Sequence, residues 1–274
     1  MNVRTTALSA ALLLAFGVPC AARADVPLEA SLALTINALN GEHQTGSLSG
    51  ADRLNFVPLP LLEMRIRRGA DSLRIEGLPP VAFSYDVTTT AFGRAGRGLQ
   101  TTRLGIVNAT YRRALPGGWF AGAGMTLYNQ HTAYPTSAGG FSYVRSVPPQ
   151  AGTYPITGRE EQYSRVVGAR FEAGREIALS AATRLEAWAA LNPALHGVQY
   201  TYVPSTLTSP TFADPEQATQ VDLAARIARR IGRRTELLYG VHYLNYTAHY
   251  NEIPGLMADR NVGIAPTVGL RTAL

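Results

Sequence analysis

The sequence contains no lysine, a single cysteine (Cys20) and, after its first two dozen residues, no apolar run of helical membrane-span length. The lack of cysteine excludes a disulfide framework, so an exported chain of this size needs a large core or a closed sheet. The lack of an apolar run excludes transmembrane helices, which need about 20 consecutive apolar residues. A closed β-barrel is then the remaining way to cross a bilayer.

Because the chain contains no lysine, all 25 of its permanently basic side chains are arginine. Arginine suits fixed, partly buried ion pairs, because its planar fork bonds a carboxylate through two N–H groups. Without Arg4 and Arg23, 23 arginines accompany 19 acidic residues along the chain. This small, scattered excess argues against nucleic acid as a partner.

The first 24 residues are expected to be a cleaved signal peptide. Arg4 supplies the positive charge, residues 7–18 form the apolar stretch, and Ala22-Arg23-Ala24 matches a cleavage site. Pro19 directly before Cys20 disfavours lipidation at this cysteine. Residues 25–274 are expected to form one exported domain.

Apolar and polar residues alternate along most of this domain, which is the pattern of half-buried β-strands. Between Trp119 and Gln130, bulky apolar side chains fall on one face, and Gly, Thr and Gln fall on the other. The same period marks segments near residues 28, 62, 73, 104, 119, 161, 184, 219, 235 and 261. The sequence therefore predicts an all-β fold of about ten antiparallel strands, with eight or twelve as alternatives.

The predicted connections alternate between long and short. Long ones, rich in Gly, Pro, Ser and Thr, are expected at 39–57, 88–100, 131–160, 203–217 and 251–260. Tight turns are expected near 69–71, 115–118, 181–183 and 232–234. This one-sided arrangement is typical of a transmembrane up-and-down barrel with its short turns in the periplasm, where both chain ends would then lie.

In such a barrel the apolar face, with Trp119, Met125 and Leu127, contacts lipid, and the polar face lines the lumen. A secreted β-sandwich, whose apolar faces bury each other, is the alternative. Charged residues on the predicted inner faces disfavour the sandwich, because an apolar core would leave them unsolvated.

In these features the chain resembles Gram-negative outer-membrane β-barrel proteins as a general class, in architecture rather than in a family motif. The resemblance implies outer-membrane lipid and lipopolysaccharide as surroundings, the barrel assembly machinery as a partner, and a monomer. The chain departs from the class at its end, where an aromatic residue recognised during assembly is usual and Leu274 stands instead.

Many of the charged residues at positions predicted to face the lumen lie near the short turns. A small barrel leaves little free lumen, so their side chains are expected to pair and close it. A narrow, anion-leaning channel is the alternative, because seven arginines accompany five acids in this group. Its members are Glu63, Arg65, Arg67, Arg74, Glu76, Arg170, Glu172, Arg184, Glu186, Arg226, Glu236 and Arg271.

Other positions predicted to face the lumen lie nearer the long loops and carry hydrogen-bonding residues. They predict a pocket open to the outside, with ordinary polar lining of the lumen as the alternative. They are Asp86, Tyr128, Ser164, Asn192, His196, His242 and Tyr246.

A hydrolase site made of Ser164, Asp86 and one of two histidines, His196 or His242, is a further alternative. These residues come from separate strands, and no nucleophile signature surrounds Ser164. The ten-stranded outer-membrane proteases, which the chain resembles in strand count, are expected to carry paired rim aspartates and a His–Asp couple. Neither is visible in the sequence, so we expect a structural, ligand-binding or surface-interaction barrel and no enzyme. The histidines lack metal-ligand spacing, and neither a metal nor a cofactor is expected.

Overall fold

The computed structural model describes residues 28–45, 50–91, 94–133, 141–143, 153–155, 161–202, 211–250 and 258–274. Within them, it describes the side chains of residues 29–36, 58–82, 84, 101–133, 161–200, 202, 211, 213, 215–249, 260 and 262–274. The expected signal peptide lies outside the described residues.

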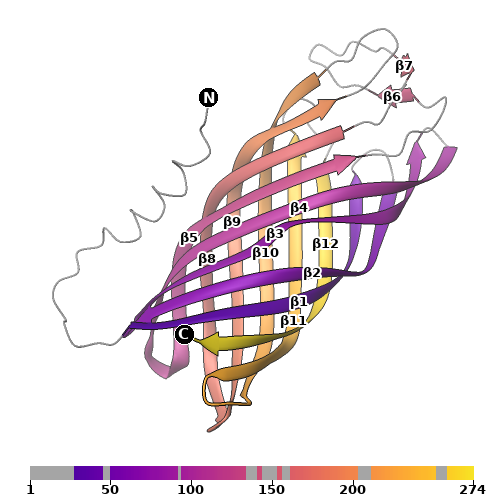
Figure 1. Cartoon of the computed structure of the whole chain (residues 1–274). Helices are drawn as coiled ribbons and strands as arrows, with labels where there is room; N and C mark the ends of the chain where they lie inside the picture. The colour runs from indigo at the N-terminus through magenta and orange to yellow at the C-terminus, as the bar shows by residue number, and fades with distance from the viewer. Residues whose placement is uncertain are drawn as a thin grey trace.

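Ten antiparallel strands close into one barrel (Figure 1), which confirms the predicted all-β up-and-down architecture and its strand number. Each strand pairs with its neighbours along the chain, and β1 pairs with β12 to close the cylinder. The barrel strands are β1 (Leu28–Thr45), β2 (Gly50–Arg68), β3 (Asp71–Ala91), β4 (Arg94–Ala114), β5 (Trp119–Ala133), β8 (Glu161–Ser180), β9 (Thr183–Tyr202), β10 (Thr211–Arg230), β11 (Thr235–Tyr250) and β12 (Ala258–Ala273).

Three short elements of the described chain are not strands of the barrel wall. The three-residue strands β6 (Phe141–Tyr143) and β7 (Thr153–Pro155) pair with each other between β5 and β8. A 3₁₀ turn, η1 (Pro116–Gly118), joins β4 to β5. In the part of the chain that the structure describes, no helix is long and apolar enough to span a membrane.

The tight turns lie together at one end of the barrel, here called the short-turn end, where β1 begins and β12 ends (Figure 1). Three of their glycines have a backbone that other residues rarely adopt, since φ is 60° at Gly69, 73° at Gly117 and 79° at Gly118. At Gly118 a Cβ would also lie 2.2 Å from the carbonyl oxygen of Glu176 on β8. The glycine therefore lets this turn pack against the next hairpin.

The opposite end, here called the long-loop end, departs from the prediction in its first two connections. The long connections expected at 39–57 and 88–100 are wrong, because β1 extends to Thr45, β2 begins at Gly50, β3 extends to Ala91 and β4 begins at Arg94. The connections after β5, β9 and β11 are longer, as expected. The missed strand ends are rich in Gly, Thr and Asn and lack the apolar alternation that marks a strand with one buried face.

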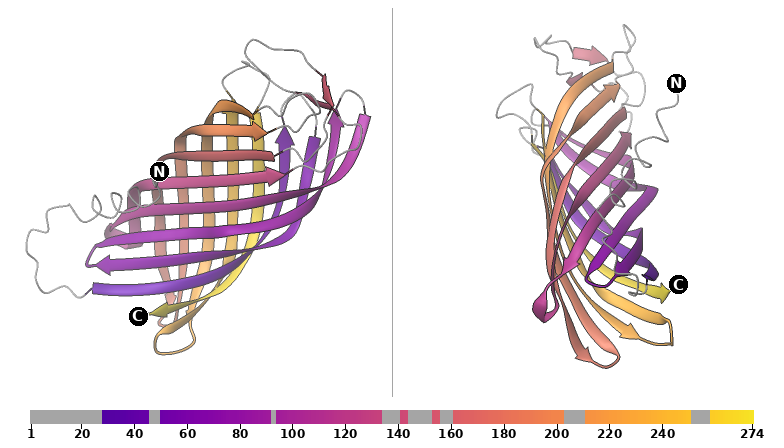
Figure 2. Two further views of the ribbon diagram at one scale, coloured as in Figure 1. Left: turned by 45° about the horizontal axis from the view of Figure 1, so that its top comes forward. Right: turned by 90° about the vertical axis from the view of Figure 1, so that its left-hand side faces the viewer.

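The strands are longer than a bilayer requires. Strands β3 and β4 each contain 21 residues, which is about 69 Å of extended chain and a rise of about 50 Å at a tilt of about 40°. The oblique course of the strands is visible in Figure 2. Because the hydrocarbon core of a bilayer is about 30 Å thick, the wall at β3 and β4 exceeds it by about 20 Å.

The two faces of the wall carry opposite chemistry. Large apolar side chains are exposed on the outside, including Leu34 (48%), Met125 (53%) and Ile264 (53%), whereas Arg74 (2%) and Arg170 (0%) are buried inside. The alternative of a β-sandwich is thereby excluded, since the apolar rows of the barrel do not bury one another.

Register shifts interrupt the period of two in several of the described strands, and two of them are bulges that decide where predicted residues point. Opposite β4, Leu78 pairs with Ile106 and Val81 with Leu104, so β3 gains one residue at Pro79 and Pro80. Proline suits such positions because it cannot donate a ladder hydrogen bond. Beyond this bulge the parity of β3 is reversed, so that residues of even number, such as the exposed Ser84, fall on the outer face.

The second bulge is in β9, where Leu195 pairs with Ala218 and Asn192 with Gln220. Asn192 and Leu195 are both fully buried, and Pro193 and Ala194 between them are exposed. Every residue of β9 after the bulge therefore points to the face opposite the one that an unbroken alternation predicts.

Candidate functional site in the barrel lumen

Two buried glutamates are the centres of the charged lumen. Glu63 on β2 accepts hydrogen bonds from Arg74 (3.0 and 3.1 Å), Arg226 (2.9 and 3.1 Å) and Arg271 (3.4 Å). Glu186 on β9 accepts bonds from Arg226 (2.6 Å) and Arg271 (2.7 and 3.0 Å). Each carboxylate therefore bonds guanidinium groups from more than one strand, and these charge-assisted bonds cross the lumen.

A second set of ion pairs lies next to this one, on the side of the long-loop end. Glu172 on β8 pairs with Arg74 (3.2 Å) and with Arg112 of β4. Arg170 pairs with Asp222 of β10. Asn108 donates to Glu76 at 3.1 Å, which continues the network into neutral hydrogen-bonding residues.

All twelve residues of the predicted network lie in the lumen wall and take part in ion pairs. The sequence reasoning missed Arg112, Glu176 and Asp222, which make eight arginines and seven carboxylates in total. Glu176 shares the parity of Glu172, and Asp222 shares that of Arg226. A stricter count of parity would have found them.

An indole ring lies among the arginines. The guanidinium carbons of Arg74, Arg226 and Arg112 lie 4.5, 4.9 and 5.9 Å from the ring centroid of Trp188 on β9. Stacking over an aromatic face stabilises a cation that has lost its water. Trp188 was not predicted to face inward, although it has the parity of Glu186.

Glycines on neighbouring strands make room for these long side chains. A Cβ at Gly240 would lie 2.7 Å from Cβ of Arg226, and a Cβ at Gly122 would lie 3.1 Å from Cγ of Arg112. The nearest atoms to such a Cβ are backbone oxygens of the neighbouring strand, of Ala225 at 2.2 Å from Gly240 and of Tyr111 at 2.6 Å from Gly122. The two glycines thus allow a close approach of that backbone as well as of the arginine stems.

An apolar layer lies between the ion pairs and the long-loop end. Val166 and Leu195 are completely buried in it, and the rings of Tyr128 and Tyr246 stack with centroids 4.6 Å apart. Its buried members are Leu59, Leu78, Leu104, Tyr128, Val166, Leu195, Ala218, Tyr246 and Ala248. The prediction had placed apolar side chains outside only, and the β9 bulge accounts for Leu195.

Polar side chains meet again beyond this layer. The buried carboxylate of Glu216 accepts hydrogen bonds from Tyr246 (2.8 Å) and from Ser164. Tyr128 donates to Gln130, which donates to Thr132 at 2.9 Å. Three predicted pocket residues, Tyr128, Ser164 and Tyr246, thus lie together at this level.

The other predicted pocket residues lie elsewhere. His196 is exposed on the outer face, so its predicted inward position is wrong; the β9 bulge reverses the parity that suggested it. The side chain of Asp86 lies outside the described residues, and the prediction for it assumed unbroken parity across Pro79 and Pro80. Asn192 lies deeper, where it donates to Thr126 at 2.8 Å.

His242 also lies deeper, beside the charged network. Its Nε2 is 3.9 Å from Oδ1 of Asp222, across the β10–β11 pair. The described contacts of Ser164 include no histidine, because Ser164 bonds Glu216. The described residues therefore do not bring together the proposed Ser–His–Asp arrangement. Among them, no group of three or more metal-ligating side chains is placed to hold a metal ion.

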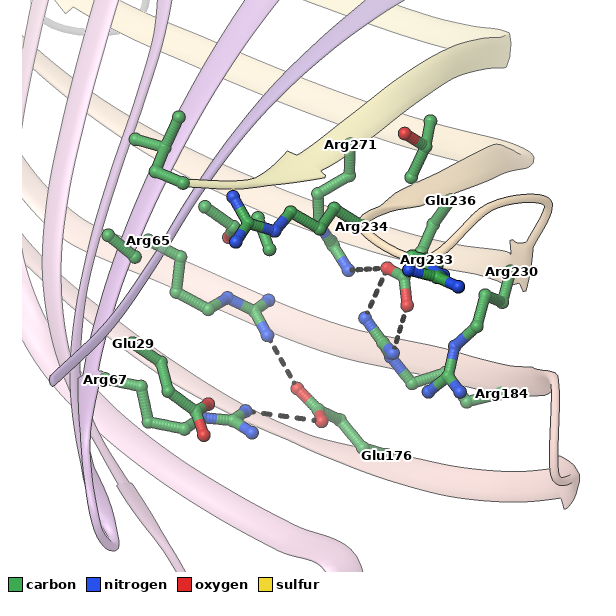
Figure 3. A pocket seen from close by; sticks show the side chains of 15 residues that line it. Glu29, Arg65, Arg67, Glu176, Arg184, Arg230, Arg233, Arg234, Glu236 and Arg271 are labelled. Carbon is green, nitrogen blue, oxygen red and sulfur yellow. Dashed lines mark hydrogen bonds and ion pairs between the residues drawn. The ribbon is translucent and has the colours of Figure 1, made fainter. Parts of the chain in front are cut away.

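The lumen opens at the short-turn end into a cavity of about 520 Å³, here called the basic vestibule (Figure 3). On its inner side Arg65 donates to Glu176 (2.8 Å), and Arg184 bonds Glu236 through two nitrogens (2.6 and 2.7 Å). Its charged lining consists of Glu29, Arg65, Arg67, Glu176, Arg184, Arg230, Arg233, Arg234, Glu236 and Arg271.

Neither a protein-family model nor a curated protein sequence matches the chain. Its fold is similar to that of the outer membrane protease OmpT from Escherichia coli, with a TM-score of 0.64 over 90% of this chain and 97% of that chain, at 8% identity. The Pseudomonas putida toluene transporter TodX is a weaker match (TM-score 0.37, 10% identity, 91% of this chain and 90% of that chain). The β domain of the Bordetella autotransporter BrkA is also weaker (TM-score 0.40, 15% identity, 90% of this chain and 100% of that chain). The chain thus has the fold of a Gram-negative outer-membrane β-barrel protein.

The prediction that the chain is not an enzyme is contradicted by the first of these matches. OmpT is a protease, and its barrel shares this fold over nearly its whole length, so the architecture gives no reason to exclude catalysis. One ground of the prediction also fails, since His242 does have an acidic neighbour, Asp222, on the adjacent strand.

Proposed function

We propose that the protein is an integral outer-membrane barrel with a closed lumen, which acts by binding ligands or partners at its two solvent-facing ends. The observation behind the proposal is the sequence of two different barriers along one narrow lumen. The ion-pair network fills the half toward the short-turn end, and the apolar layer follows it.

The two barriers oppose conduction for different reasons. An ion that enters the network must break charge-assisted hydrogen bonds between buried partners such as Glu63 and Arg226. An ion that enters the apolar layer must lose its water without gaining a polar partner, which costs several kcal/mol or more. A solute would have to overcome both barriers in turn.

A narrow channel that favours anions is the second candidate. Eight arginines accompany seven carboxylates in the network, and seven accompany three in the vestibule. Such an excess lowers the electrostatic barrier for anions relative to that for cations.

Conductance across planar lipid bilayers tests the proposal. We expect no current steps from the wild type, and none from Val166→Ser/Leu195→Ser or Arg65→Ser/Arg74→Ser, because each variant retains one barrier. The variant with all four substitutions is expected to conduct. Heat-dependent migration on a detergent gel would verify that each variant is folded. Anion-selective current steps from the wild type would contradict the proposal of a closed barrel and would support the channel instead.

The remaining features are part of the same proposal. We place the short-turn end and both chain ends in the periplasm, with residues 1–24 as the export signal. The barrel assembly machinery would insert the chain as a monomer, and the exposed apolar rows would contact membrane lipid and lipopolysaccharide. Surface labelling of intact cells, compared with lysed cells, would test this orientation.

A further inference from the structure

The basic vestibule has more cations than its own carboxylates can neutralise. Its unpaired members are Arg230 at the end of β10 and Arg233 and Arg234 in the turn before β11. Among the described residues, no ion pair joins these three to a carboxylate. The cations farther inside, such as Arg65 and Arg184, are paired with Glu176 and Glu236.

Backbone hydrogen bonds hold the turn that bears the unpaired arginines. The amide of Ile231 donates to the carbonyl oxygen of Thr235 (3.0 Å), and the amide of Ala273 on β12 donates to that of Arg234 (2.8 Å). The turn is thus tied both to its own hairpin and to the neighbouring strand. A held backbone reduces the conformational entropy that is lost when the side chains close on a ligand.

The paired arginines can also contribute hydrogen bonds. The side chains of Arg67 and Arg184 are 42% and 32% exposed although each contacts a glutamate. Arg184 and Arg271 donate hydrogen bonds to the carboxylate of Glu236, and Figure 3 shows Arg233 and Arg234 among the side chains that line the same cavity. Guanidinium groups from several strands therefore border one space.

We infer that the basic vestibule binds a phosphate-bearing anion that enters from the short-turn end. Seven arginines against three glutamates leave an excess of four positive charges among the side chains of the lining. A phosphate group combines about two negative charges with several acceptor oxygens, and the guanidinium fork matches this geometry. The volume of about 520 Å³ lies in the range of small-molecule sites, so the phosphate is expected to be carried by an organic group.

This inference goes beyond the closed barrel proposed above. The unpaired arginines lie outside the ion pairs that would close the lumen, so binding in the vestibule is expected whether or not the barrel conducts. The phosphate could belong to a soluble metabolite or to the headgroup of an anionic phospholipid. Both sources present the same chemistry to the arginines.

Calorimetry on the purified full-length protein in uncharged detergent tests the inference, with inorganic pyrophosphate and glycerol 3-phosphate as probes. The test variant is Arg233→Gln/Arg234→Gln. The control is Arg113→Gln/Arg229→Gln, which removes the same charge from exposed positions that do not line the vestibule. In a second arm, phosphatidylglycerol or phosphatidylcholine is added to the micelles, and its ability to displace pyrophosphate is measured.

We expect pyrophosphate to bind the wild type, and the test variant to bind about tenfold or more weakly, while the control changes by less than about twofold. Displacement by phosphatidylglycerol alone would identify a lipid headgroup as a ligand of the site, and no displacement would identify a soluble one. Equal weakening in both variants would overturn the inference, because it would indicate non-specific attraction to net charge. The absence of pyrophosphate binding would also overturn it.

Discussion

Glu63 is the carboxylate on which four lumen arginines converge, since Arg65, Arg74, Arg226 and Arg271 all form ion pairs with it. Its replacement by Gln removes the charge opposite Arg74, Arg226 and Arg271, all of which stay buried. Breaking a buried ion pair on one side costs about 3–5 kcal/mol, because the remaining charge is uncompensated. We expect Glu63→Gln to lower the free energy of unfolding by about that amount, measured by urea denaturation in detergent micelles.

Glu29→Gln is the matched control for this experiment. Glu29 lines the vestibule but is exposed, so its replacement is expected to change the free energy of unfolding by about 0.5 kcal/mol or less. Equal unfolding midpoints for Glu63→Gln and the wild type would contradict the account of the network as a structural element.

The bulge in β9 decides which residues of that strand face lipid. Because Pro193 and Ala194 add one residue, Leu195 points inward and His196 outward. In a Cys20→Ser background, which contains no other cysteine, we expect a fluorophore on His196→Cys to be quenched by brominated lipid. One on Leu195→Cys should be neither readily attached nor quenched. The reverse pattern would show that the strand keeps unbroken parity.

Such bulges explain why the strands were easier to predict than the positions of individual side chains. The alternation that indicates a strand, as in 119–130, is repeated along the chain and survives local errors. Whether a residue such as His196 is predicted to face inward depends on an unbroken alternation from the nearest position whose orientation is known. One inserted residue reverses this predicted orientation. The sequences Pro79-Pro80 and Asn192-Pro193 do not by themselves indicate whether the proline ends a strand, bends it or forms a bulge in it.

The residues of the ion-pair network were predictable for a related reason. The positions from Glu63 to Arg67, Arg74 to Glu76 and Arg170 to Glu172 each lie on a short stretch of strand whose pairing with a neighbouring strand has no register shift, so the parity within each stretch is unbroken. Contacts across strands were not predictable in this way. The approach of His242 to Asp222 depends on the register of β10 and β11, which the sequence alone does not specify.

At the scale of the whole molecule, the direct pairing of β1 with β12 leaves the barrel without an open sheet edge. A closed hydrogen-bonded cylinder with a buried ionic interior is expected to resist sodium dodecyl sulfate at room temperature. We therefore expect the unheated protein to migrate at a different position from the boiled protein on a gel. A single position under both conditions would argue against a stable closed barrel.

The height of the wall has a consequence for what can reach the protein. If the short-turn end lies near one membrane surface, the far ends of β3 and β4 stand about 20 Å above the opposite hydrocarbon boundary. A bulky macromolecule that headgroups would otherwise hold at a distance can dock on these raised strand ends. The vestibule, recessed and close to the lipid on its own side, instead admits only compact solutes or the lipids that surround it.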